Sequence, residues 1–173
     1  MKIRKAILSD AKGIANVHVD SWRTTYSGIV PEEFLQQLSY ESREEMWKRG
    51  IPNGHVFVAE NENGEIVGFA CGGKERSGNY ESYQGELYAI YILKEYQGQG
   101  LGKKLVVPVV KQLLDKDINT MLVLVLVENK SCLFYETLGA RKLDTLEVDI
   151  GGKTLKEAVY GWGNLKVSFN TMF

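Results

Sequence analysis

Residues 97–102 read Gln-Gly-Gln-Gly-Leu-Gly, and they follow an apolar, strand-like run that ends at Ile92. After them, apolar side chains recur every four positions from Leu101 to Leu113, which predicts an amphipathic helix within residues 98–116. A helix N-terminus presents backbone N–H groups without intrahelical acceptors, and glycines let that backbone approach a ligand closely. The stretch therefore predicts a turn that binds a pyrophosphate, with an ordinary strand-to-helix turn as the alternative.

Two other phosphate-binding turns do not fit this spacing. A dinucleotide-binding turn has the pattern G-x-G-x-x-G, whereas the glycines here fall as G-x-G-x-G. A nucleoside-triphosphate loop places Lys-Ser or Lys-Thr after its last glycine, whereas Gly102 is followed by Lys103-Lys104. The ligand of this turn must be identified from the rest of the chain.

The segments around the turn predict a mixed α/β (α+β) fold. Hydrophobic patterning and turn residues indicate helices early in the chain, then three strands, a helix, a strand, a helix and two final strands. This order predicts one mixed sheet with helices on both faces, in a single domain over residues 1–173. The expected strands are 2–7, 56–59, 66–71, 86–92, 121–127, 140–150 and 155–162. Pro108 should kink the helix after the turn unless neighbouring groups compensate.

Composition excludes several other classes. The 173 residues carry a formal net charge of -1 with Lys and Arg scattered along the chain, so a nucleic-acid-binding face is not expected. The longest apolar run, from Met121 to Val127, is too short to cross a bilayer, and the start of the chain has no apolar signal core. Cys71 and Cys132 lack the spacing of a metal site or a disulfide framework. We therefore expect a cytoplasmic protein without a metal or a membrane partner.

Beyond the glycine turn, the chain resembles the GNAT superfamily of acyl-coenzyme A dependent N-acetyltransferases. The superfamily's cofactor loop reads (Gln or Arg)-x-x-Gly-x-(Gly or Ala), as residues 97–102 do. The run from Glu86 to Ile92 is similar to its fourth strand, and Asn129 followed by Phe134-Tyr135 and Gly139 is similar to its second cofactor segment. The resemblance covers nearly the whole chain. It implies a splayed sheet and transfer of an acetyl group from acetyl-CoA, the cosubstrate, to a primary amine, with no metal.

The resemblance also implies where acetyl-CoA lies. A V-shaped opening between the fourth and fifth strands would let the pantetheine arm pair with backbone groups of Ile90 and Ile92. The pyrophosphate would lie on the turn, formed by Gln97, Gly98, Gln99, Gly100, Leu101 and Gly102. Asn129 would contact the pantetheine, or else cap the helix that follows it.

Acetyl transfer needs a proton donor for the leaving thiolate and an acceptor for the amine proton. Tyr135 matches the tyrosine that often protonates the thiolate in this superfamily; packing beside Phe134 is the alternative. Glu86 stands where several members place the carboxylate that takes the amine proton, although a paired charge or ordered water remains open. His18 is the alternative titrating group, or equally a core histidine.

Acceptor and transfer route are less constrained by the sequence. Trp22 and Tyr26 lie in the segment that often borders the acceptor pocket in this superfamily, and their helical spacing is also typical of core contacts. The acceptor could be a small-molecule amine, a peptide N-terminus or a lysine, and the superfamily commonly forms homodimers. Direct attack is preferred over a covalent route through Cys132, which has no adjacent histidine. A non-catalytic acyl-CoA sensor and transfer of another acyl group are the alternatives.

Overall fold

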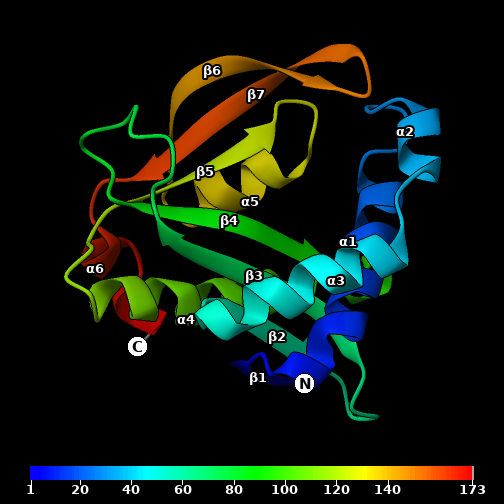
Figure 1. Ribbon diagram of the computed structural model, residues 1–173. Helices are drawn as coiled ribbons and strands as arrows, with labels where there is room; N and C mark the ends of the chain where they lie inside the picture. Colours follow the sequence, from blue (N-terminus) through cyan, green and yellow to red (C-terminus); the bar gives the residue numbers. More distant parts are fainter. Residues whose placement is uncertain (173) are drawn as a thin grey trace.

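The computed structural model describes residues 1–172, and Figure 1 shows them as helices packed around a single sheet. The strands are β1 (Lys2–Lys5), β2 (Val56–Glu60), β3 (Ile66–Lys74), β4 (Gly85–Ile92), β5 (Met121–Leu126), β6 (Arg141–Ile150) and β7 (Lys153–Trp162). The α-helices are α1 (Ala11–Thr25), α2 (Glu32–Gln36), α3 (Tyr40–Gly50), α4 (Leu101–Leu114), α5 (Ser131–Thr137) and α6 (Leu165–Ser168). Short 3-10 turns are η1 (Leu8–Asp10), η2 (Ile51–Asn53), η3 (Lys94–Tyr96) and η4 (Asn170–Met172).

The sheet is mixed, as its sequence pattern predicts. Its strand order is β1-β2-β3-β4-β5-β7-β6. Strands β4 and β5 run parallel, and the other neighbouring pairs among the described residues are antiparallel. A parallel pair needs a crossover connection, and α4 provides it between β4 and β5. The glycine turn therefore leads into the helix that joins the two central strands.

Helices cover both faces of the sheet, which confirms the predicted arrangement (Figure 1). On one face α1 and α3 pack on β2 and β3, with Ile14, Val17 and Phe69 in their shared core. On the other face α4 packs through Leu105, Val109 and other buried residues of its apolar stripe. Within residues 1–172, no helix combines the length and apolar character that a bilayer-spanning segment needs.

Helix α4 continues through Pro108. Proline has no N–H to donate to the carbonyl four residues earlier, which here belongs to Lys104. Lys104 is exposed and Pro108 is only partly buried, whereas their neighbours Leu105 and Val109 face the core. The missing bond thus lies on the outer side of the helix, where water can hydrate the free carbonyl, and the buried stripe keeps its regular spacing.

The central pair of strands separates soon after it forms. Strands β4 and β5 pair only at Gly85–Met121, Glu86–Leu122 and Leu87–Val123. On the other side of β4, the register with β3 shifts so that Tyr88 has no partner between Leu87 and Ala89. A bulged residue bends its strand and increases the local twist. The second half of β4 therefore turns away from β5 and leaves an opening in the sheet.

Gly72 makes close packing possible opposite this bulge. A Cβ atom at position 72 would lie 2.7 Å from the carbonyl oxygen of Glu86 and 2.6 Å from Cγ1 of Val109. Because the first contact is with backbone, the strand or α4 must move to relieve it. We expect Gly72→Ala to lower the free energy of unfolding by about 2 kcal/mol, as overpacking does.

Urea denaturation measures this change, with Gly163→Ala as the matched control. A Cβ atom at position 163 meets no atom within 4 Å, so the control should keep the wild-type stability within about 0.5 kcal/mol. Equal stabilities for the two variants would show that the bulge region tolerates movement.

Candidate active site

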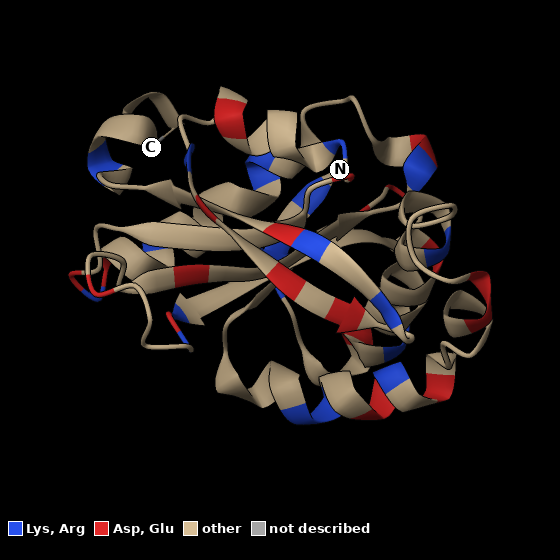
Figure 2. Cartoon of the chain, turned by 90° about the horizontal axis from the view of Figure 1, so that it is seen from above, with Lys and Arg blue, Asp and Glu red and all other residues tan. Residues whose placement is uncertain are grey.

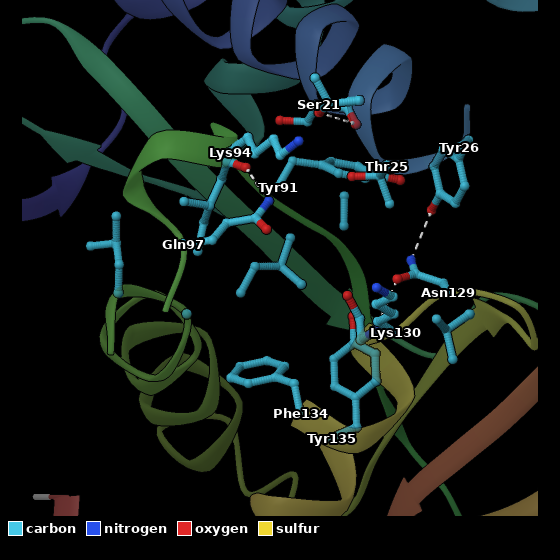
Figure 3. A pocket seen from close by; sticks show the side chains of 18 of the residues that line it. Ser21, Thr25, Tyr26, Tyr91, Lys94, Gln97, Asn129, Lys130, Phe134 and Tyr135 are labelled. Atoms are coloured by element: carbon cyan, nitrogen blue, oxygen red, sulfur yellow. Dashed lines mark hydrogen bonds between the residues drawn. The ribbon is translucent and has the colours of Figure 1, made fainter. Parts of the chain in front are cut away.

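A cleft of about 800 Å³ opens where β4 and β5 part. Its walls come from the end of α1, the second half of β4, the glycine turn, β5 and the start of α5. Figure 3 shows side chains from these elements, among them Tyr26, Tyr91, Gln97 and Tyr135, arranged around one opening. The segments that the sequence marks out separately thus meet at one place.

At one end of the cleft, the glycine turn presents a row of backbone donors. Gly98 and Gly100 have φ angles of +74° and +75°, a region that L side chains rarely adopt, so glycine is required at both positions. Gly100 caps the N-terminus of α4. The backbone N–H groups of residues 98–103 donate to no acceptor in the described part of the chain. This cradle is open and partially positive, and it fits a diphosphate.

Along one wall, β4 turns unpaired backbone groups into the opening. Leu93 donates its N–H to the carbonyl of Val67 on β3, and an antiparallel ladder alternates such pairs. Tyr91 therefore pairs towards β3, while Ile90 and Ile92 turn their N–H and carbonyl groups towards the missing part of β5. These are the two residues predicted to pair with the pantetheine, and both line the cleft.

The two glutamines of the turn hold its shape through their side chains. Gln97 Nε2 donates to the carbonyl of Ile92 at 2.9 Å, so this carbonyl already has a partner. Gln99 Nε2 donates to the carbonyl of Glu95 at 3.1 Å, and Gln99 is not among the residues that line the cleft. Only the backbone N–H of Gln99 is thus available to a ligand on the turn.

Asn129 forms hydrogen bonds at the start of the helix that follows it. Its Oδ1 accepts from the N–H of Ser131 at 2.9 Å, the first residue of α5. Its Nδ2 donates to the hydroxyl of Tyr26 at 3.4 Å, which ties the end of α1 to this corner of the cleft (Figure 3). Asn129 thus bonds the start of α5, whose N-cap is Lys130, and it also lines the cleft, where the predicted pantetheine contact stays a prediction.

Tyr135 is a buried wall of the cleft. It is only 5% exposed, packs against Phe134 and meets Trp162 in an edge-to-face contact at 6.1 Å between ring centroids. No hydrogen-bond partner of its hydroxyl occurs within residues 1–172. Burial, and then the nearby Tyr26, raise the pKa of Tyr135 above its usual value, so the phenol keeps its proton at neutral pH. Figure 3 places its ring beside the opening.

Glu86 lies away from the cleft, in an ion pair. Its carboxylate is 4% exposed and accepts from the guanidinium of Arg76 at 2.6 and 3.2 Å and from the backbone N–H of Arg76 at 3.1 Å. The guanidinium of Arg76 in turn stacks on the ring of Tyr88, with Cζ 4.0 Å from the ring centroid. All three donors come from Arg76 and Glu86 does not line the cleft, so the geometry favours the paired-charge alternative for Glu86 over the role of base.

His18 packs in an aromatic cluster next to β4. Its ring stacks on Tyr91 with centroids 5.4 Å apart, and its Nδ1 accepts from Nε1 of Trp47 at 3.2 Å. Burial, with a smaller effect of Arg43, lowers the pKa of His18 to about 4. The ring is neutral at pH 7 and does not line the cleft, as the core-histidine alternative predicts.

The two aromatic candidates for acceptor binding differ in position. Tyr26 ends α1 and lines the cleft, whereas Trp22 lies one turn earlier and does not. Trp22 contacts Tyr26 edge to face at 4.6 Å and also packs near Phe34 and Tyr91. The indole N–H of Trp22 is buried and has no partner in the described residues. Trp22 therefore stands behind Tyr26 in the same aromatic wall.

Three lysines at the cleft were not singled out from the sequence. Lys94, Lys103 and Lys130 line the opening, on the turn after β4, on the first turn of α4 and just before α5. Their positive charge suits phosphate groups near the glycine turn. In the sequence, the pair Lys103-Lys104 directly after Gly102 is the feature that indicates positive charge at this turn. Figure 2 shows Lys and Arg interspersed with Asp and Glu elsewhere in that view.

The side chains that bind metals are not gathered anywhere in the described structure. Within residues 1–172, no group of three or more His, Cys, Asp or Glu side chains is placed to hold an ion.

Comparison with known proteins identifies the family. The sequence profile of the Acetyltransferase (GNAT) family matches residues 16–140, which include both walls of the cleft and the glycine turn. This chain belongs to the GNAT family of acetyltransferases. An uncharacterized N-acetyltransferase of Bacillus subtilis, YuaI, is 44% identical over 163 residues, covering 94% of this chain and 93% of its own length. As a GNAT member, the chain is an acetyl-CoA dependent N-acetyltransferase.

Solved structures share the GNAT fold of this chain. The PaiA N-acetyltransferase from Thermoplasma acidophilum, solved in complex with coenzyme A, superposes with a TM-score of 0.70 at 24% identity over 90% of this chain and 96% of its own. The yncA protein from Salmonella typhimurium, solved with acetyl-CoA, has a TM-score of 0.72 at 20% identity over 95% and 94% of the two chains. At these identities the likeness establishes the fold, including the splayed sheet.

The lowered pKa of His18 predicts that the folded chain loses stability in acid. The unfolded chain takes up a proton on this histidine below its ordinary pKa of 6.5, whereas the folded chain does so only near pH 4. The stability that the neutral ring contributes is therefore complete above pH 6.5 and falls as the pH drops towards 4, by up to about 3 kcal/mol.

Urea denaturation from pH 7.5 to 4.5 measures this loss. We expect His18→Asn to lose less stability over this range than the wild type. His55→Gln, at the other histidine of the chain, serves as the control. It should lose nearly as much stability over this pH range as the wild type does. If His18→Asn loses as much stability in acid as the wild type, the proton uptake occurs at another residue.

Proposed function

We propose that this N-acetyltransferase moves the acetyl group directly from acetyl-CoA to a primary amine while both substrates are bound. The observation that carries the proposal is the opening between β4 and β5, which joins a row of free backbone donors at one end to a buried tyrosine on its wall. An acyl carrier bound there would extend from the glycine turn past the edge of β4 to Tyr135.

Acetyl-CoA fits this cleft through backbone groups. The N–H groups of residues 98–103 would bind the pyrophosphate, with Lys103 on the first turn of α4 adding positive charge. The free groups of Ile90 and the N–H of Ile92 would pair with the amides of the pantetheine arm, as an added strand does. A backbone N–H of β4 would also stabilise the negative charge that develops on the carbonyl oxygen, worth a few kcal/mol in comparable sites.

Tyr135 supplies the proton for the leaving sulfur in this proposal. Burial keeps its phenol protonated at neutral pH, and its hydroxyl has no protein partner in the described residues to compete for that proton. A positioned acid of this kind contributes about 100-fold to 10,000-fold to the rate. Its position on α5 is set by the Asn129 hydrogen bond at the start of that helix and by packing of the ring on Trp162.

Neither cysteine supports a covalent intermediate. Cys71 is buried in the core beneath α1 and α3, and burial raises the pKa of its thiol to about 12. Burial also raises the pKa of Cys132, whose Sγ lies 3.8 and 3.9 Å from the carbonyls of Leu126 and Val127. A thiol is a nucleophile only as the thiolate, and neither residue lines the cleft. Direct attack by the amine is therefore the simpler route.

The names of relatives support a nitrogen acceptor without selecting one. YuaI and an archaeal relative from Archaeoglobus fulgidus are both called uncharacterized N-acetyltransferases. A pig thialysine N-epsilon-acetyltransferase is 42% identical over 59 residues, which is 34% of this chain and 35% of its own. These names carry over to this chain as a proposal that the acceptor is a primary amine.

Two measurements test the proposed function. Calorimetry with acetyl-CoA should show saturable binding, and no heat with any coenzyme A species would contradict the cleft assignment. Release of free thiol should then be followed with n-butylamine, 1,4-diaminobutane, lysine and a short peptide with a free N-terminus. Binding without thiol release on any amine would favour an acyl-CoA sensor instead, and competition between acetyl-CoA and succinyl-CoA tests the acyl group.

Replacing the proposed acid gives a sharper result. We expect Tyr135→Phe to lower kcat about 100-fold, because sulfur then leaves without its proton donor. The affinity for acetyl-CoA should be unchanged, since the turn and β4 are intact. Calorimetry and thiol release measure the two quantities separately.

Tyr160→Phe is the matched control. Tyr160 also lies near Tyr135, but its hydroxyl donates to Glu136 at 2.8 Å and it does not line the cleft. At temperatures below its unfolding transition, this variant should have a kcat within about twofold of the wild-type value. A Tyr135→Phe enzyme as active as the control would leave Tyr135 as a packing residue.

A further inference from the structure

A second carboxylate, Glu157, lies on the same face of the sheet as Glu86. On β7 it pairs with Leu126 of β5 and Leu146 of β6, and directly paired residues point to the same face. Leu126 shares that face of β5 with Leu122 and Leu124. Leu122 is the partner of Glu86 on β4, and Leu124 lines the cleft. Glu157 therefore stands beside the part of β5 that borders the opening.

Two segments flank this face and leave Glu157 between them. On one side, the segment between β3 and β4 is tied to β6 because Tyr80 donates to Asp144 at 3.1 Å. On the other, the β6–β7 turn is tied to the chain after α1, because Lys153 Nζ donates to the carbonyl of Ile29 at 2.9 Å. Figure 1 shows the hairpin of β6 and β7 spanning from the first segment to α2. Both ties hold the β6–β7 hairpin over this face, and Glu157 itself is not among the residues that line the cleft.

Glu157 has no cation partner among the described residues. Glu86 is neutralised by Arg76, whereas Glu157 is partly buried and makes no ion pair or hydrogen bond through its carboxylate within residues 1–172. Burial, and then the charge of Glu86, raise the pKa of Glu157. Burial raises the pKa of Tyr26 and of Tyr80, and the charge of Glu157 is a smaller further cause in both, so Glu157 is near the cleft wall and the flanking segment.

An unpaired carboxylate in a partly desolvated place costs stability, which a bound cation would offset. The neighbouring wall fits an alkylammonium ion. Leu155, two residues from Glu157 on the same face, packs with Leu126 and Tyr26, and Trp22, Phe34 and Tyr91 extend this cluster. Aromatic faces attract ammonium groups, and the apolar surface suits an aliphatic chain.

We propose that Glu157 binds the ammonium group of the acceptor and takes up its first proton, so that the acceptor class is a cationic alkylamine. The inference rests on the proposed function and names the substrate of that same site. Glu86, held by Arg76, then contributes a fixed charge on the same face. In this assignment Glu157 is the catalytic base and Tyr135 the acid.

The proton and bond changes balance without another reactant. The ammonium gives one proton to the Glu157 carboxylate and becomes a neutral amine. Its nitrogen then bonds to the acetyl carbon, the carbon–sulfur bond breaks, and sulfur leaves with the electron pair and takes the Tyr135 proton. The nitrogen releases its second proton to Tyr135, and Glu157 returns its own to solvent, so the net products are the amide, the free thiol and one proton.

The test compares an acceptor that is cationic with one that is already neutral. At pH 7.5, n-butylamine carries an ammonium group, whereas O-butylhydroxylamine is unprotonated. We expect Glu157→Gln to lower kcat/KM for n-butylamine about 100-fold, as removal of a general base does. The same variant should keep kcat/KM for O-butylhydroxylamine within about threefold, because no proton has to be removed before attack. Calorimetry should show unchanged acetyl-CoA affinity.

Glu147→Gln is the matched control. Glu147 lies on the same hairpin and pairs with Lys156, so it points to the opposite face from Glu157. This variant should match the wild type with both acceptors. An equal fall for both acceptors in Glu157→Gln would show a structural role, and no fall for either would overturn the inference while leaving the proposed function in place. A wild-type enzyme that acetylates no amine would overturn both.

Discussion

The structure depends on a ladder of hydrogen bonds that stops early. Strands β4 and β5 pair through Leu87–Val123 and then part, next to the bulge at Tyr88. Within a sheet, unpaired backbone groups are costly unless water or a ligand satisfies them. Here those of Ile90 and Ile92 face an open cleft, and the N-terminus of α4 presents further unpaired donors at its end. One interruption of the sheet thus creates both the opening and the polar groups that line it.

Burial near this opening shifts the pKa of several titrating groups. Removal from water disfavours charge, so Tyr135 keeps its proton and His18 remains neutral. Glu86 can be charged in the interior because Arg76 meets it with three hydrogen bonds. Glu157 has no such partner, and this difference between two carboxylates on one sheet face is the basis for assigning them different roles.

Much of the fold could be predicted from short-range patterns. The period-four stripe from Leu101 to Leu113 predicts α4, and the glycines at positions 98 and 100 predict the tight turn before it, because both signals act within a few residues. The continuously apolar run that becomes β5 likewise predicts a buried central strand. Pro108 shows the limit of such rules, since its effect depends on which side of the helix faces water.

The amino-acid sequence by itself determined the order of elements, the mixed sheet and the glycine turn, because these follow from local periodicity and glycine conformation. Only the tertiary structure decided which side chains meet. Arg76 pairs with Glu86, and Asn129 bonds the first residue of α5. Glu157 comes beside the cleft from β7, which begins 61 residues after β4 ends. Charge pairing and desolvation depend on distances across strands, and no spacing along the chain encodes those distances directly.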